Sequence, residues 1–139
     1  MKQYLQHRIF TIIKEIIDPD GLPTYVIGGY VRDCIMGRQS KDIDIVVVGS
    51  GIDLARKVAR KTGPGTSLSI FKSFGTAMLK FEDTEIEFVG ARKESYHRES
   101  RKPIVENGTL EDDQCRRDFT INTLAIGLHD KQYGQLIDP

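Results

Sequence analysis

Hydrophobic residues near the amino terminus recur with the period of an α-helix. They fall at positions i, i+4, i+7, i+8, i+11 and i+12, which is one stripe along a helix. The stripe consists of Leu5, Ile9, Ile12, Ile13, Ile16 and Ile17. The pattern predicts an amphipathic helix over residues 3–17. The sequence Asp18-Pro19-Asp20-Gly21 ends it, because proline cannot donate a hydrogen bond into a helix and glycine adopts turn conformations.

Stretches rich in β-branched residues alternate with further helical segments in the next part of the chain. We expect, in chain order, a strand over residues 24–27, a turn at Gly28-Gly29, a helix over 30–36, a strand over 42–48 and a helix over 53–61. Two strands over 77–82 and 85–89 flank a turn at Asp83-Thr84 and so predict a hairpin. The pattern indicates a mixture of strands and helices.

The second half of the chain is less regular. Residues 91–117 show no periodicity and are mostly charged, which predicts a long, mobile loop. A helix over residues 118–126 and a short strand over 135–137 complete the expected elements. Long loops in compact domains are often functional, so the predicted loop is a candidate part of a site.

Length and composition favour a single domain. The 139 residues are 39% hydrophobic, enough for one core, and 20 Lys and Arg balance 20 Asp and Glu, so no overall positive charge attracts nucleic acid. Cys34 and Cys115 match no metal-binding spacing, and we interpret them as small buried thiols in a reducing, cytoplasmic setting. Polar residues interrupt the first hydrophobic stretch, so we expect neither a signal peptide nor a membrane span.

Asp42 and Asp44 are the strongest chemical signal. Residues two apart in a strand point to the same face, and neighbouring carboxylates repel each other unless a cation lies between them. Their side chains can converge on two metal ions, as in two-metal phosphoryl transfer. Mg²⁺ suits such a site because it binds a few carboxylates and shares its other ligands with phosphates and water. The alternative is that Asp42 caps a turn and Asp44 is solvated at the end of the strand.

The turn at Gly28-Gly29 is a candidate phosphate site. Glycines let the backbone approach a phosphate, and the first N–H groups of the following helix favour its negative charge. Arg32, one turn into that helix, adds a cation suited to phosphate. Asp33 is a candidate anchor for it, and the alternative is an ordinary solvated charge on the helix. Taken alone, the glycine pair also fits a simple tight turn. The glycines belong to neither a dinucleotide-binding fingerprint nor a P-loop, and the aspartate pair lacks the later residues of an EF-hand.

A third carboxylate is available in the strand over residues 85–89. Glu85 and Glu87 share one face of this strand, and Ile86 and Phe88 share the other. Glu87 lies deeper in the strand and is our candidate for a third metal ligand. The alternative is an ordinary solvent-facing edge.

A polar motif closes the predicted loop. Asp118 and Asn122 stand four residues apart on one face of the predicted helix, and both can hydrogen-bond a sugar or a base edge. Arg116 and Arg117 add positive charge at the entrance. Asp118 alone would equally serve as a helix N-cap.

Together these segments resemble one protein family. The motifs are GGYVRD at 28–33, DID at 42–44, FGT at 74–76, ARKESYHRESRKP at 91–103 and RRDFTIN at 116–122. In order and spacing they resemble the head domain of bacterial class II tRNA nucleotidyltransferases and poly(A) polymerases, and the resemblance covers nearly the whole chain. It implies an α/β (α+β) fold of the nucleotidyltransferase type over residues 1–139, with a mixed, mostly antiparallel sheet and helices packed on one side.

The resemblance also implies roles for individual residues. The implied ligands of the two catalytic Mg²⁺ ions are Asp42 and Asp44, with Glu87 as a weaker third. The residues implied to hold the triphosphate are Gly28, Gly29 and Arg32. Those implied to contact the incoming nucleotide are Arg117, Asp118 and Asn122.

The implied function is template-independent addition of CCA, or part of it, to tRNA 3′ ends from CTP and ATP. Poly(A), A-only or CC-only addition are alternatives, and a nucleotide-binding module that is inactive by itself is an alternative of another class. The sequence stops at Pro139, where the family continues into neck, body and tail domains. We therefore interpret it as a truncated piece of a longer enzyme, without the neck element that selects C or A.

Overall fold

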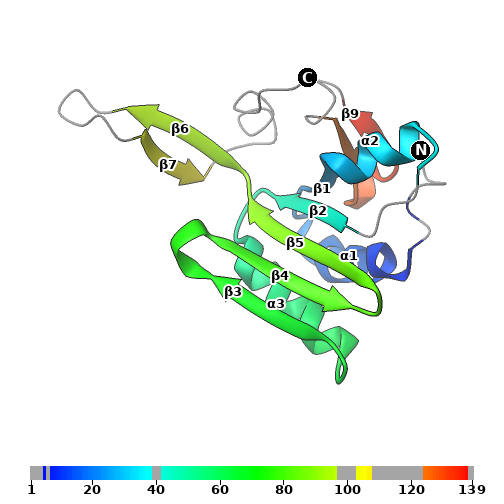
Figure 1. Ribbon diagram of the computed structural model, residues 1–139. Helices are drawn as coiled ribbons and strands as arrows, with labels where there is room; N and C mark the ends of the chain where they lie inside the picture. Colours follow the sequence, from blue (N-terminus) through cyan, green and yellow to red (C-terminus); the bar gives the residue numbers. More distant parts are fainter. Residues whose placement is uncertain (1–4, 6, 39–41, 97–102, 108–123, 138–139) are drawn as a thin grey trace.

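A seven-stranded sheet forms the centre of the computed structural model, which describes residues 5, 7–38, 42–96, 103–107 and 124–137 (Figure 1). The strand order is β3-β4-β5-β2-β1-β8-β9. The strands are β1 (Thr24–Ile27), β2 (Asp42–Val47), β3 (Ser67–Phe71), β4 (Thr76–Phe81), β5 (Thr84–Gly90), β8 (Ala125–Gly127) and β9 (Leu136–Ile137). Neighbouring strands are antiparallel except β2 and β5, which are parallel. The expected mixed, mostly antiparallel sheet is confirmed.

Helices α1 (Arg8–Ile17) and α3 (Gly51–Thr62) cover one face of the sheet (Figure 1). Their apolar stripes pack on every second residue of the central strands, and Val31 of α2 (Gly29–Ile35) joins the same core. Short 3₁₀ turns are η2 (Asp18–Asp20), η3 (Lys72–Phe74) and η5 (Asp130–Gln132). Within the described residues, no helix is long and apolar enough to span a membrane.

The first helix is shorter than its hydrophobic stripe predicts. It begins at Arg8 rather than at residue 3, because His7 has extended backbone angles and its side chain accepts a hydrogen bond from the Ile9 N–H. Leu5 is nevertheless buried. The stripe thus identified residues that face the core, although one of them precedes the helix.

Two predictions for the second half of the chain are wrong where the structure describes it, and residues 97–102 and 108–123 lie outside the described residues. Strands β6 (Arg92–Tyr96) and β7 (Pro103–Asn107) form an antiparallel hairpin within the predicted 91–117 loop. The two segments, RKESY and PIVEN, show no regular alternation of polar and apolar residues, so the period of a strand does not mark them. The helix predicted to reach residue 126 is also corrected, since Ala125 and Ile126 pair with β1 and are fully buried in β8.

Strand β3 was not expected from the sequence. It lies at the edge of the sheet and pairs with β4 from Ser67↔Lys80 to Phe71↔Thr76. Its polar and apolar residues do alternate, with Leu68 and Ile70 packed toward the helices. That alternation was the available signal, but five residues behind a Gly-Pro-Gly turn made it weak.

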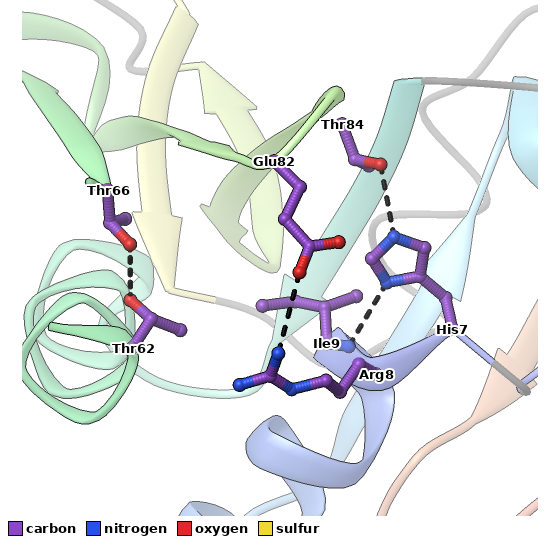
Figure 2. Close-up of polar contacts among 7 residues, drawn as sticks. All are labelled: His7, Arg8, Ile9, Thr62, Thr66, Glu82 and Thr84. Carbon is purple, nitrogen blue, oxygen red and sulfur yellow. Dashed lines mark hydrogen bonds and ion pairs between the residues drawn. The ribbon is translucent and has the colours of Figure 1, made fainter. Parts of the chain in front are cut away.

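His7 joins the start of α1 to the turn between β4 and β5 (Figure 2). Its Nδ1 accepts a hydrogen bond from the Ile9 N–H at 3.1 Å, which leaves Nε2 to donate to Thr84 Oγ1, also at 3.1 Å. Arg8 lies 3.5 Å from Glu82 in the same turn, with its guanidinium over the Phe81 ring. The cap of one helix therefore also fixes the hairpin that includes β5.

Replacement of His7 by alanine is expected to lower the free energy of unfolding by about 1 kcal/mol, because one helical N–H loses its side-chain acceptor. Asparagine at this position retains such an acceptor and should recover most of the loss. Urea unfolding of the two variants measures this difference. An unchanged midpoint in His7→Ala would show that the cap contributes nothing.

Candidate active site

Four carboxylates lie on one face of β2 and β5, which we call the carboxylate face. In the parallel pairing of these strands Asp42 lies opposite Glu85, and Asp44 lies opposite Glu87. The residues between and beside them are buried in the helix-covered core: Ile43, Ile45, Ile86 and Phe88. Because strand residues alternate, the carboxylates point to the other face. Asp44 and Glu87 are half-buried there, whereas Asp42 and Glu85 are exposed.

A cavity of about 280 Å³ opens over these carboxylates. Its lining residues are Asp42, Ile43, Asp44, Met78, Glu85 and Glu87. Carboxylates this close repel one another, so the site favours a cation. Among the residues that the structure describes, no group of three or more His, Cys, Asp or Glu side chains is placed to hold a metal ion. Mg²⁺ fits the site without such a group, because it binds through one or two carboxylates and completes its shell with water and substrate phosphates.

The Gly28-Gly29 turn lies beside the aspartates. Ile27 pairs with Asp44 in the antiparallel β1–β2 ladder, so the chain leaves β1 at Gly28 next to the start of β2. Gly28 has φ of 70° and ψ of −137°, a conformation that side-chain-bearing residues rarely adopt. This backbone angle explains why a glycine precedes α2. The structure thus brings the predicted phosphate turn and the predicted metal ligands to the same end of the sheet.

Arg32 lies back over the glycine turn. A β-carbon placed on Gly29 would lie 3.3 Å from Arg32 Nη2, so the guanidinium sits against the start of α2. Its Nε donates a hydrogen bond to Asp33 Oδ1 at 3.2 Å. Asp33 therefore holds Arg32 and is not simply a solvated charge on the helix. The Arg32 side chain remains 37% exposed, which allows a phosphate to reach it.

Cys34 also lies on α2. It is a free thiol and is half-buried, not fully buried as expected. Burial raises the pKa of Cys34, the hydrogen bond with Tyr30 lowers it and the negative charge of Asp33 raises it. Burial also raises the pKa of Tyr30. Both groups therefore stay protonated at neutral pH, which argues against a role as nucleophile or base. Cys115 lies outside the described residues.

The other residues singled out from the sequence lie outside the described residues: Arg116, Arg117, Asp118 and Asn122. The described chain resumes at Leu124, and the next residue, Ala125, pairs with Ile27. Sequence reasoning missed Met78, which lines the cavity because it pairs with Glu87 across β4 and β5. The alternation within the predicted hairpin was the signal that could have found it.

Comparison with known proteins places this arrangement in a family. The sequence family described as the poly A polymerase head domain matches residues 24–139. The chain belongs to this family. An A-adding tRNA nucleotidyltransferase of Aquifex aeolicus (strain VF5) is 44% identical to the head domain over 117 residues, which cover 84% of this chain and 14% of that protein. A CC-adding tRNA nucleotidyltransferase of Deinococcus radiodurans is 36% identical over 114 residues, which cover 81% of this chain and 30% of that protein.

Solved structures agree with the head-domain fold. A tRNA nucleotidyltransferase in complex with a primer tRNA and an incoming ATP analog has a TM-score of 0.76 and 40% identity, over 91% of this chain and 34% of that one. A CCA-adding enzyme in an apo form has a TM-score of 0.81 and 35% identity, over 98% of this chain and 32% of that one. The head domain thus spans about a third or less of the length of these proteins.

Proposed function

We propose that this head domain catalyses template-independent addition of nucleotides to the 3′ end of tRNA, with CTP and ATP as substrates. The observation that carries the proposal is the position of Asp42, Asp44 and Glu87 on one sheet face, next to the Gly28 turn. Nucleotidyl transfer needs a charged site of this kind beside a phosphate-binding turn. The names of the relatives, which include A-adding and CC-adding tRNA nucleotidyltransferases, support the same chemistry.

In this proposal, triphosphate binding and metal binding fall to residues on different elements of the fold. Gly28, Gly29 and Arg32 bind the triphosphate on the β1 side, and Asp33 orients the arginine. Asp42 and Asp44 would hold the two Mg²⁺ ions, with Glu87 as the adjacent third carboxylate. When bound, Mg²⁺ activates the RNA hydroxyl and neutralises charge on the transferred and leaving phosphates.

The proposed reaction uses no template, so protein groups must contact the incoming nucleotide. We propose that Arg117, Asp118 and Asn122 contact the sugar and base edge of the incoming nucleotide, because their side chains supply both donors and acceptors. They follow in sequence the β6–β7 hairpin and precede β8, the strand next to β1.

The direct test is an incorporation assay with the complete natural protein, Mg²⁺, each labelled nucleoside triphosphate, and tRNA ending before the CCA or after its CC. We expect incorporation of CTP, ATP or both at the RNA 3′ end, and none of GTP or UTP. ATP transfer only to tRNA ending in CC would assign A addition, in line with three A-adding relatives at 44%, 42% and 36% identity. A folded protein that binds triphosphates and transfers none would instead be a nucleotide-binding module.

Replacement of Arg32 by alanine is expected to weaken ATP and CTP binding alike, because a phosphate contact carries no base information. Loss of one charge-assisted hydrogen bond costs about 1.5 kcal/mol, which corresponds to about a tenfold loss of affinity. We take the lower end of the usual range because the guanidinium is partly exposed. Equilibrium titration with both triphosphates measures the change. A variant that lost affinity for one nucleotide only would contradict the phosphate role.

A further inference from the structure

The carboxylate face continues beyond β5 onto the two outer strands, β4 and β3. Strand pairing sets up two adjacent rows across this face. The first row runs through Asp44, Glu87, Met78 and Ser69. The second runs through Val46, Val89, Thr76 and Phe71. Val46 and Thr76 of the second row are buried, so the open surface runs from the floor of the proposed active site to β3 along the first row, and Phe71 lies at the exposed end of the second.

Phe71 stands out on this surface. Its neighbours Leu68 and Ile70 pack toward the helices, so alternation along β3 directs Phe71 to the carboxylate face. It is 46% exposed, and only Ile35 and Met36, both at the end of α2, are comparable large hydrophobic residues in the described part of the chain. An exposed aromatic ring on a sheet face offers a flat surface on which a nucleic-acid base can stack.

The charge of the face changes between β5 and β4. Strands β2 and β5 present four carboxylates, whereas β4 and β3 present none. The outer residues on this face are Ser67, Ser69, Phe71, Thr76, Met78 and Lys80. Lys80 is exposed and lies opposite Glu85 in the β4–β5 pairing, so the outer part carries one positive charge at its border with the carboxylates and no negative charge of its own. An RNA backbone is repelled by the carboxylates but is accepted by this outer surface.

The geometry of the reaction gives the RNA a direction across the sheet. The glycine turn and Arg32 place the triphosphate on the β1 side of Asp44, and Glu87 lies on the other side. In an in-line displacement the attacking and leaving oxygens are on opposite sides of the phosphorus. The RNA hydroxyl therefore arrives over β5, and the RNA behind it passes over β4 and β3. Phe71 lies three strand spacings across the sheet and two residues along it from Asp44, about 16 Å in all, or between about four and five stacked nucleotides.

We propose that Phe71 is a stacking platform for a base of the RNA primer, within about five nucleotides of its 3′ hydroxyl. The inference rests on the proposed function, because it takes the direction of the RNA from the positions of the triphosphate and the carboxylates. It assigns β3, a strand with no role in the metal or triphosphate site, to binding of single-stranded RNA.

Steady-state kinetics of the complete natural protein tests the proposal. Phe71→Ala is expected to raise the KM for the RNA primer about tenfold, with kcat and the KM for the nucleoside triphosphate within about twofold of wild type. Phe71→Tyr keeps an aromatic ring and should restore the primer KM. Met36→Ala, which removes a side chain of similar exposure outside the carboxylate face, is the matched control. An unchanged primer KM in Phe71→Ala, or an equal rise in Met36→Ala, would overturn the proposal.

A photoreactive p-benzoylphenylalanine at position 71 supplies a second readout that does not depend on how alanine affects folding. We expect cross-links to the primer within about five nucleotides of its 3′ end. Cross-links to another part of the protein, and none to RNA, would mean that protein covers Phe71 and would refute the RNA platform. If the proposed function is wrong, the protein incorporates no nucleotide with any residue at position 71, including the natural phenylalanine. This outcome differs from failure of the stacking proposal, in which incorporation continues and only the effect of Phe71 is absent.

Discussion

Replacement of Asp44 by alanine is expected to reduce nucleotide incorporation by the complete protein by about a thousandfold or more, because charge neutralisation at the phosphate is the main source of rate in this kind of site. Asp44 is the half-buried member of the aspartate pair and lies opposite Glu87. The remaining carboxylates cannot take its place, because their backbone positions are set by strands whose neighbouring residues are buried.

The fold should tolerate this change. Asp44 lies on the face opposite the helix-covered core, so its truncation leaves no cavity in that core and the urea midpoint should change little. Glu85→Gln is the comparison variant, because Glu85 is an exposed carboxylate on the same face and is expected to change the rate by less than about tenfold. Wild-type turnover by Asp44→Ala at ordinary Mg²⁺ concentration would remove Asp44 from the metal site.

Replacement of Gly51 by alanine is expected to lower the free energy of unfolding by about 3 kcal/mol. Helix propensity alone points the other way, since alanine stabilises a helix by up to about 1 kcal/mol relative to glycine. Gly51 begins α3 and is buried against β5, where an added β-carbon would lie 2.8–2.9 Å from the backbone C, Cα and N atoms of Val89. Backbone atoms of a central strand cannot move aside as a flexible side chain does, so steric overlap outweighs propensity.

Urea unfolding of Gly51→Ala and of Lys57→Ala tests whether the free energy of unfolding falls, as steric overlap predicts, or rises, as helix propensity predicts. Lys57 lies in the same helix and is exposed, so its replacement should change stability by no more than about 0.5 kcal/mol. The Gly51 variant should also lose activity, because Val89 lies two residues from Glu87 on the displaced strand. A more stable Gly51→Ala protein would mean that α3 and β5 are less closely packed than the structure has them.

Much of the candidate site could be predicted because its residues are close in sequence and share a local period. The spacing of Asp42 and Asp44 within one strand was enough to place both on one face. The same reasoning put Glu85 and Glu87 together. It could not show that Asp44 faces Glu87, because that depends on the parallel register of two strands that are distant in sequence.

Local pattern also failed where pairing partners decide the structure. The sequence around Ala125 and Ile126 predicts a helix when it is considered alone. In the structure these residues are buried and pair with β1, a strand near the amino terminus. The segments RKESY and PIVEN of the β6–β7 hairpin do not alternate regularly, so no hydrophobic period marks them. In both cases hydrogen bonds to a partner strand outweigh intrinsic preference, and the sequence of one segment contains no information about its partner.

The sequence by itself determined which residues of α1, β2 and β5 face the core and which side chains are suited to metal and phosphate chemistry, because these follow from local period and residue type. Only the tertiary structure decided how those parts meet. It joined the Gly28 turn to Asp44 through β1 and β2, brought Glu87 beside them through β5, and placed Phe71 on the same face through β4 and β3. Register between strands sets these neighbours, and register results from packing of the whole sheet against its helices.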